Sequence, residues 1–351
     1  GFTNQLLANS KTDSLLNVLS HLIDERHLID ERKELELHHL QSVWQSAASD
    51  AARFELAGRL FHAWLHYNTN SAYFYATTRM QIARMSQNPL WMHEALLNHA
   101  SVLNATGMYV EALQTMSEVF PNLSDMPLRL YAFHLYRTIY GAMADYTSHK
   151  ELRTLYQQNV RSYRDSILLY TSVFDPDYKL VKADKLIDAG SCQEAIVLLE
   201  SNFQSSSDSR YQAMVAHTLA TAYRCLNNRN QQINWLAQSA ILDLSASVKE
   251  YISLWELALV LFDDGDVDRA YHYLKCSLED AIFSNARLRT IRISEVFPLI
   301  DKAYQARVLK QKQQLTTFLI VITLLLVVLM VTLIYILIQM KRLRSIRFAL
   351  N

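Results

Sequence analysis

Near the start of the chain, apolar positions recur with the period of an α-helix. The stripe that includes Leu15, Leu19 and Leu22 predicts one long helix over residues 12–48, within an N-terminal segment 1–50. Residues 21–26 and 27–32 both read HLIDER. Six residues turn a helix by about 600°, so the two copies face different directions. We therefore interpret the duplication as added charge on a solvated face.

From residue 51 onward the pattern changes to shorter amphipathic segments with brief breaks between them. An Ala, a Gly seven residues later and an Ala five residues after that recur three times. Two antiparallel helices about 8–10 Å apart need small residues where their backbones approach most closely. A degenerate copy with Ala216 and Ala220 lacks the Gly. The three full sets are Ala100, Gly107 and Ala112; Ala183, Gly190 and Ala195; and Ala258, Gly265 and Ala270.

This spacing resembles the tetratricopeptide repeat, a helix–turn–helix unit with small residues at the helix crossing. We expect about six helix pairs over residues 51–297, some of them degenerate. Ala72 would lie in the second helix of a pair that precedes the first full set, and residues 128–170 would form a pair broken near Asp145. The predicted fold class is therefore an all-α, tetratricopeptide-like helical solenoid, which buries its core collectively and presents a concave face to partners.

The longest apolar stretch is residues 315–338, which contain no charge, Pro or Gly. As a helix it would be roughly 36 Å long, against a hydrocarbon core of about 30 Å. A buried core helix is the alternative, but such a helix is rarely apolar on every side. We predict one transmembrane helix, whose threonines can bond to carbonyls one turn earlier. Before it we expect a juxtamembrane helix over 298–314, with a break or kink at Pro298.

The charges beside the span predict its orientation. Residues 339–351 carry Lys341, Arg342, Arg344 and Arg347 and no acid, and short basic segments stay cytoplasmic. The preceding side is also basic, but long domains cross largely regardless of charge. We expect a basic cytoplasmic stub and a large external domain. If the link between them is rigid, a change in the repeats reaches the cytoplasm.

Composition supports a helical protein with few turns. The 351 residues include six Gly and five Pro, against roughly 25 and 17 at average usage. Basic and acidic residues are equal at 34 each, which gives no nucleic-acid footprint. Cys192, Cys225 and Cys276 are far apart and odd in number, so they predict neither a zinc site nor a disulfide framework. They look like small packed residues, and at least one must stay unpaired.

Several longer phrases resemble one known family: membrane-bound tetratricopeptide regulators of polysaccharide-utilisation loci, the type that includes the starch-utilisation regulator. The phrases are TDSLLNVLSHLIDER at 12–26, NSAYFYATTRMQIA at 70–83, ADYTSHKELRTLYQQNVRSYRDSILLY at 144–170 and LEDAIFSNARLRTIRISEVFPLIDKAY at 278–304, with the span and the basic tail RLRSIRFALN.

The resemblance implies a periplasmic repeat domain, one span of the bacterial inner membrane and a cytoplasmic part that controls transcription. That cytoplasmic part is absent from this sequence, so we expect no direct nucleic-acid binding by the chain as given. A secreted domain needs a signal peptide, which we expect was removed or left out of this numbering. We expect either that the sequence is a fragment cut at Asn351 or that this member of the family has lost its transcription-control region.

Candidate chemistry is sparse. GxSxG, HExxH, P-loop and GxGxxG motifs do not occur, so we expect no enzyme and no cofactor. His62 and His66 lie one helical turn apart and could hold a metal, but ordinary surface histidines are the simpler interpretation. Four aspartates within 263–268 resemble a calcium loop by composition only. We predict no metal site.

The first helices of such repeats line the concave side, and their polar positions predict a groove for a polar ligand. A solvated inner face without a ligand is the alternative. The tyrosines of the 131–146 helix should mostly pack between helices. The candidate groove residues are Glu94, Asn104, Asp184, Asp188, His217, Arg224, Trp255 and Asp263.

Two functions fit these predictions, and a homodimer is compatible with either. The first is a single-pass sensor that binds a periplasmic oligosaccharide or protein and relays the signal to a transcription-control region. The second is a membrane-anchored scaffold that recruits periplasmic proteins without signalling. A membrane-tethered hydrolase is a third option, but it needs a nucleophile or acid pair that the sequence does not offer.

Overall fold

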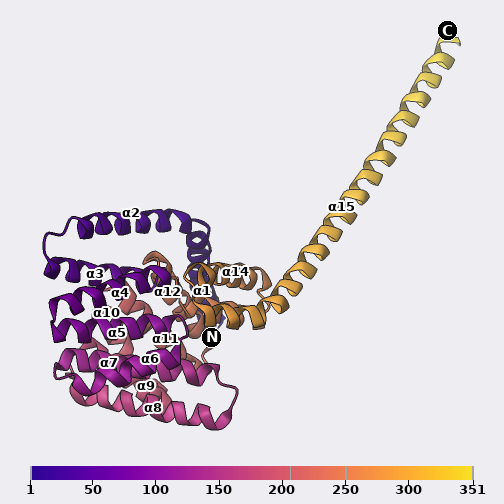
Figure 1. Ribbon diagram of the computed structural model, residues 1–351. Coiled ribbons are helices and arrows are strands. Elements are labelled where there is room, and N and C mark those ends of the chain that lie inside the picture. Colours follow the sequence, from indigo (N-terminus) through magenta and orange to yellow (C-terminus); the bar gives the residue numbers. More distant parts are fainter. Residues whose placement is uncertain (1, 206, 250, 350–351) are drawn as a thin grey trace. The chain divides into compact units, whose positions relative to one another are not determined.

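The computed structural model describes residues 2–205, 207–249 and 251–349, among which there are fifteen α-helices, one short 3₁₀ helix and no strand. The all-α prediction is confirmed. By its internal packing the chain divides after Phe297 into two compact units. The first contains the repeats (Figure 1).

Six helix pairs make up the repeats, in agreement with the expected number. Within each pair the two helices pack directly against each other. The pairs are α3 (Asp50–Leu65) with α4 (Thr69–Ser86), α5 (Pro89–Ala105) with α6 (Tyr109–Val119), α7 (Met126–Tyr146) with α8 (Lys150–Tyr170), α9 (Pro176–Asp188) with α10 (Cys192–Ser205), α11 (Ser209–Cys225) with α12 (Arg229–Ser245), and α13 (Ser253–Asp263) with α14 (Val267–Phe283).

The small residues of the repeat pattern lie where the pattern requires. All six alanines of the three full sets have no exposed surface, so their lack of a side chain beyond Cβ lets paired helices approach. Gly107, Gly190 and Gly265 end the first helices with φ of 82°, 81° and 84°. This left-handed conformation costs glycine little because it has no Cβ.

The degenerate pair α11–α12 forms the same turn with a different residue in the left-handed position. Asn227 follows Ala220 by seven positions, and it has a φ of 55°. Asparagine is the residue that most readily replaces glycine in the left-handed region. Its amide N–H donates to the carbonyl of Arg224, as that of Gly107 does to Asn104. The missing glycine therefore does not change the turn.

The N-terminal segment forms two helices rather than the single helix predicted. α1 (Phe2–Asp24) and α2 (Arg26–Gln45) are separated at Glu25, whose φ and ψ are −97° and 6°. α1 packs against α12 and α14, whereas α2 packs mainly against α3. The prediction of one helix was wrong because the two halves pack against different helices. Sequence periodicity does not reveal these packing partners.

The repeated HLIDER segments are also not merely solvated charge. Asp24 lies 3.3 Å from His272 Nε2, Arg26 pairs with Glu279, and Asp30 lies 2.7 Å from Lys249 Nζ. These contacts tie the N-terminal helices to the last repeats. The earlier interpretation was therefore wrong for these three residues.

The stack of repeats closes on itself within the first unit. The amide of Thr69 at the start of α4 donates to the carbonyl of Ser284 after α14, at 3.1 Å. The side chain of Asn68 donates to the carbonyl of Phe283. The backbone amide of Lys249 donates to the backbone carbonyl of His66. Residues from the first pair thus contact residues more than 180 positions later, which repeat periodicity alone does not imply.

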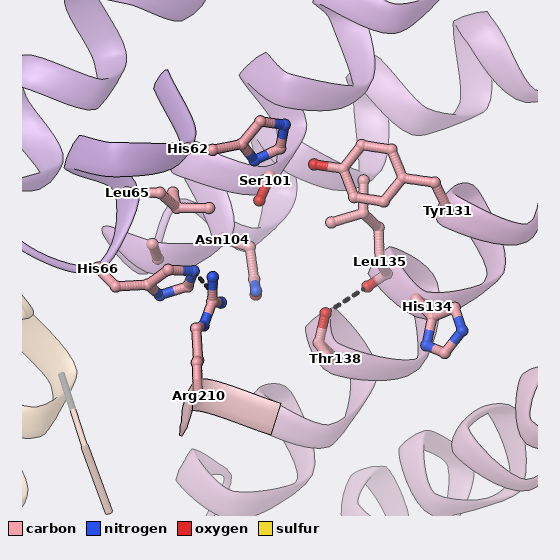
Figure 2. A pocket seen from close by; sticks show the side chains of 11 residues that line it. His62, Leu65, His66, Ser101, Asn104, Tyr131, His134, Leu135, Thr138 and Arg210 are labelled. Carbon is pink, nitrogen blue, oxygen red and sulfur yellow. Dashed lines mark hydrogen bonds between the residues drawn. The ribbon is translucent and has the colours of Figure 1, made fainter. Parts of the chain in front are cut away.

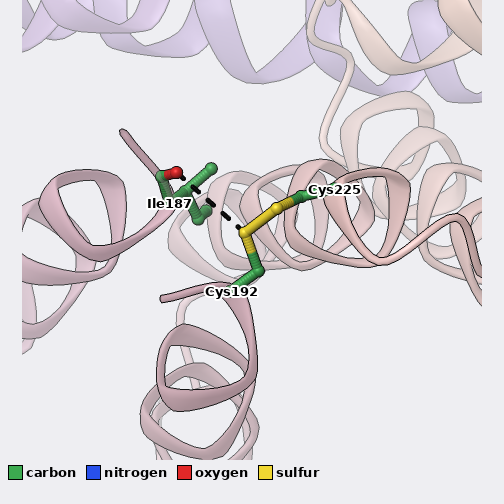
Figure 3. The surroundings of a disulfide bond; sticks show 3 residues. All are labelled: Ile187, Cys192 and Cys225. Carbon is green, nitrogen blue, oxygen red and sulfur yellow. Dashed lines mark hydrogen bonds between the residues drawn. A yellow bond between two sulfur atoms is a disulfide. The ribbon is translucent and has the colours of Figure 1, made fainter. Parts of the chain in front are cut away.

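A disulfide joins the fourth and fifth pairs (Figure 3). Cys192 begins α10 and Cys225 ends α11, with Cα atoms 6.4 Å apart. The expectation that these two cysteines are only packed side chains was wrong, because helix packing brings together residues 33 positions apart. Cys276 is buried and unpaired, as the odd count required.

The last helix, α15 (Arg287–Ala349), begins in the first unit and continues through Pro298, where the second unit begins. The helix therefore has no break at Pro298, and the kink that was the alternative stays a prediction. α15 is the one helix of the described residues that is long and apolar enough to cross a membrane, with a mean hydropathy of 3.2 in its most apolar window. The threonine hydroxyls donate back to carbonyls of the preceding turn, as predicted: Thr316, Thr317, Thr323 and Thr332.

Candidate ligand cavity

A cavity of about 360 Å³ lies between helices of the repeats (Figure 2). Its walls come from α3, α5, α7 and α11, which are all first helices of their pairs. The volume falls in the range of small-molecule sites. The lining residues are His62, Leu65, His66, Ser101, Asn104, Ala105, Tyr131, His134, Leu135, Thr138 and Arg210.

Helical periodicity places these side chains on one side of each helix. On α3, His62 and His66 are four positions apart and share a face, whereas Leu60 and Phe61 are fully buried in the core. On α5, Ser101 and Asn104 face the cavity and Ala100 packs inward. Each first helix therefore separates a packed side from a polar inner side.

Arg210, at the start of α11 in the fifth pair, completes the cavity wall. Its guanidinium donates to Nε2 of His66, a residue 144 positions away (Figure 2). Arginine has no acceptor, so the guanidinium is the donor in this hydrogen bond. This pair fixes the orientation of both side chains at the cavity wall.

Asn104 and Ser101 supply an amide and a hydroxyl to the same wall. The Oδ1 atom of Asn104 is buried and has no hydrogen-bond partner in the described protein. A buried acceptor without a donor costs about 1–3 kcal/mol. A water or a ligand donor in the cavity would remove that cost, so Asn104 marks a position where a ligand gains from binding.

His62 lines the cavity and is influenced by two arginines. Its pKa is lowered to about 4, first because the surrounding protein desolvates the charged ring and then because Arg79 and Arg210 repel the positive charge. Glu94 opposes this shift only weakly. Solvent still reaches the ring through the cavity. His62 is therefore a neutral hydrogen-bonding group at neutral pH.

The remaining wall is built by α7. Burial raises the pKa of Tyr131 to about 12, so its hydroxyl stays protonated and remains a donor. Burial, followed by the nearby Arg137, lowers the pKa of His134. The hydroxyl of Thr138, another lining residue, donates to the carbonyl of Leu135 at 2.9 Å (Figure 2).

Other tyrosines of α7 pack between helices, as predicted. The ring of Tyr136 stacks on that of Tyr163 of α8, with centroids 4.6 Å apart and an interplanar angle of 8°. Tyr140 continues this stack. Tyr131 differs because it lines the cavity.

Most of the eight predicted groove residues occupy other positions, and ligand binding by them stays a prediction. Asn104 lines the cavity. Glu94 accepts from Arg79 at 2.8 Å and so links α4 to α5. Asp184 pairs with Arg137, which links α7 to α9.

The other five candidates lie on α9, α11 and α13 outside this cavity. Asp188 accepts from Arg164 at 2.7 Å, and His217 lies 3.3 Å from Glu256. Asp263 lies 3.8 Å from Arg229. Arg224 is exposed, and the indole nitrogen of Trp255 is buried with no partner among the described atoms.

Sequence reasoning missed His62, His66, Tyr131, His134 and Arg210 as cavity residues. One signal was present, since His62 and His66 share a face of a first helix. They were interpreted as ordinary surface histidines because nothing in the sequence shows that α11 lies opposite α3. Among the described residues no group of three or more metal-binding side chains occurs, and the two histidines face an arginine.

A family model described as the SusR N-terminal TPR domain matches residues 23–295. This chain belongs to that family. The matched SusR-type region includes all six helix pairs and every residue that lines the cavity. A search of curated proteins finds no match to the chain.

Proposed function

We propose that this SusR-type protein is a single-pass membrane sensor. Its repeat unit binds an oligosaccharide in the cavity between α3, α5, α7 and α11 and relays binding through α15 to a transcription-control module across the membrane. The repeat unit would lie in the periplasm and the basic end of α15 in the cytoplasm. The observation that carries this proposal is the cavity, because it joins four first helices of a family-assigned regulator domain at one polar site.

Three further observations support the membrane sensor. α15 contains the apolar stretch suited to a bilayer. The Cys192–Cys225 disulfide is typical of an oxidising compartment such as the periplasm. The α15 helix also continues without interruption from Arg287, so helical backbone connects the repeats to the apolar stretch.

Binding is tested by titration calorimetry of the full chain in detergent micelles against a panel of oligosaccharides. We expect saturable heat with at least one glycan. Replacing Asn104 with Leu removes the unsatisfied acceptor and should abolish that heat. Asn159→Leu, at a half-buried position of α8 outside the cavity, is the matched control and should leave the heat unchanged. Flat traces across the panel would contradict an oligosaccharide sensor.

Relay through α15 is tested by a flexible Gly/Ser insert after Gln311, with genome-wide transcript levels after addition of the glycan as the readout. The insert should abolish the response to a bound glycan while leaving calorimetric binding intact. An unchanged response would show that the helical link is passive. Topology is tested by labelling Met85→Cys, whose native side chain is 81% exposed. Labelling from the cytosolic side alone would exclude a periplasmic repeat unit.

A membrane-anchored scaffold is the second candidate, and one observation favours it. Leu169, Val173 and Phe174, where α8 ends, are 75%, 56% and 87% exposed. Apolar groups in such a cluster are typical of protein contacts. If Phe174→Ser removed periplasmic binding proteins from a pull-down while glycan titrations stayed flat, the scaffold function would be favoured.

A further inference from the structure

The helix α2 buries only one of its sides. It runs along an edge of the repeat unit and packs mainly against α3 (Figure 1). Leu37 is 1% exposed on the packed side, whereas Leu28 and Leu35 are 45% and 70% exposed. Two residues turn a helix by about 200°, so Leu35 points away from the side that carries Leu37. Leu28 lies seven positions earlier on the same outer face, a spacing typical of helices that pair with another helix.

Two opposite charges lie between these leucines on the outer side of α2. The side chains of Glu31 and Arg32 are exposed. Within the described residues neither side chain forms an ion pair. Both residues come from the second HLIDER segment, whose Asp30 instead bonds Lys249 inside the chain. The outer face therefore offers two leucines and one charge of each sign to a partner.

The order of these residues makes the outer face complementary to itself. Suppose that a second copy of α2 lies antiparallel on the first, with a two-fold axis passing between positions 31 and 32. Leu28 of each copy then meets Leu35 of the other, and Glu31 of each copy meets Arg32 of the other. A two-fold interface requires such reciprocal pairs, because both copies use the same patch. A parallel arrangement would instead set Glu31 against Glu31, which is unfavourable.

We propose that the outer face of α2 is a homodimer interface, in which two copies of the chain pack antiparallel. Leu28 and Leu35 form its two apolar contacts, and reciprocal Glu31–Arg32 pairs lie between them. The overlapping helices cover about three turns, or roughly 18 Å, so the buried area is small and the dimer is reversible. The duplicated segment then has two roles, since Asp30 holds the repeat unit closed and its outer neighbours bind the second copy.

Self-association is tested by sedimentation of the full chain in detergent micelles over a range of concentrations. Leu35→Glu places a carboxylate in both apolar contacts and should weaken the dimer at least about tenfold. Leu155→Glu on α8, where the native side chain is 50% exposed, is the matched control and should leave the dimer unchanged. A monomeric native chain would overturn the proposal, as would a Leu35→Glu chain that associates like the native one.

The charge pairs are tested by exchanging their signs. Glu31→Arg alone and Arg32→Glu alone each place like charges across the interface and should weaken the dimer roughly 3- to 10-fold. The double variant restores opposite charges in reciprocal positions and should regain most of the native affinity. A double variant as weak as either single variant would overturn the proposed pairing.

The antiparallel arrangement is tested by oxidative cross-linking. A mixture of Leu28→Cys and Leu35→Cys chains should form disulfide-linked dimers. Either variant alone should not, because its two equal positions lie about 10 Å apart along the helices, beyond the reach of a disulfide. The native Cys276 is buried and Cys192 is bonded to Cys225, so neither supplies the cross-link.

Other occupants of this face give different results. Cross-linking of each cysteine variant with itself would show a parallel contact and overturn the proposal. Loss of association in Leu155→Glu alone would assign the interface to α8. A monomeric chain that binds anionic lipid vesicles only with native Leu35 would assign the face to a membrane. Circular dichroism of each variant confirms that loss of the dimer is not loss of fold.

Discussion

Two polar regions inside the repeat unit differ in how completely their groups are paired. The closure cluster consists of Asp30, Lys249, Tyr251 and Asp280, where the N-terminal helices meet the last repeats. Lys249 Nζ lies 2.7 Å from Asp30 and 3.1 Å from Asp280, and both Lys249 and Asp280 are only 4% exposed. The hydroxyl of Tyr251 donates to Asp280. Buried charges in this cluster satisfy one another.

The cavity shows the opposite arrangement. Asn104 Oδ1 has no donor among the described residues, and it lies at the wall of a cavity that His62 and His134 also line. Polar groups that satisfy one another stabilise a closed structure, whereas polar groups directed into a cavity lower stability and favour a ligand. The closure cluster therefore stabilises the contact between the N-terminal helices and the last repeats, whereas the cavity residues are candidates for ligand recognition.

The largest expected effect is at Lys249. Lys249→Met removes the cation that bonds both Asp30 and Asp280 and leaves the buried Asp280 with only the more distant charge of Arg26. Breaking a buried ion pair in this way costs about 3–5 kcal/mol. The free energy of unfolding, from urea titrations followed by circular dichroism, should fall by that order. Lys275→Met is the control, because its side chain is 53% exposed and its pair with Glu279 contributes less than about 0.5 kcal/mol. Equal stability of the two variants would contradict the role of the closure cluster.

The disulfide should have the next largest effect. Cys192→Ser with Cys225→Ser opens a loop of 33 residues. Chain-entropy estimates for such a loop give about 3–4 kcal/mol. Thermal unfolding of the native chain should shift downward on reduction, and the double variant should not respond to reductant. A reductant-sensitive melting temperature in the double variant would show that the shift has another cause.

Asn104→Leu should have a small effect on stability despite its inner position. The substitution removes an acceptor whose burial costs about 1–3 kcal/mol, but it also adds apolar surface at a cavity edge. The two effects oppose each other, so the free energy of unfolding should change by less than about 1 kcal/mol. The same urea titrations as for Lys249 measure it. A loss comparable to that of Lys249→Met would mean that the cavity wall is part of the scaffold, and the distinction between the two regions would fail.

The smallest expected effect is the pH dependence from His62. Its ring is faced by His66 from its own helix, Arg79 from α4, Arg210 from α11 and Glu94 from α5. The folded pKa of about 4 lies below the ordinary 6.5, so the unfolded chain binds more protons between these values. Stability is therefore complete above pH 6.5 and decreases as the pH falls toward 4.

The measurement compares urea unfolding at pH 7 and pH 5 for the native chain and His62→Gln. The variant should lose less stability on acidification, by less than about 1 kcal/mol because solvent reaches the ring. His21→Gln, at a side chain 70% exposed, is the control and should behave as the native chain does. An unchanged pH response in His62→Gln would contradict the depressed pKa.

Local features of the fold could be predicted from the sequence because they depend on neighbouring residues. Gly107, Gly190 and Gly265 predicted the turns since only a residue without Cβ adopts their φ at little cost. Asn227 could have been added on the same ground, because it stands seven residues after Ala220. The division of the N-terminal segment at Glu25 could not be predicted, because both halves have helical periodicity and only their different packing partners separate them.

By itself, the sequence determined the helix pairs, their turns and the apolar stretch of α15, since these follow from small residues at fixed spacing and from unbroken hydrophobicity. Only the tertiary structure decided which distant residues meet. His66 and Arg210 are 144 positions apart, and Lys249 meets Asp30 across 219. Such contacts depend on the curvature summed over six stacked pairs, and small rotations at each interface accumulate into a closure that no single repeat encodes.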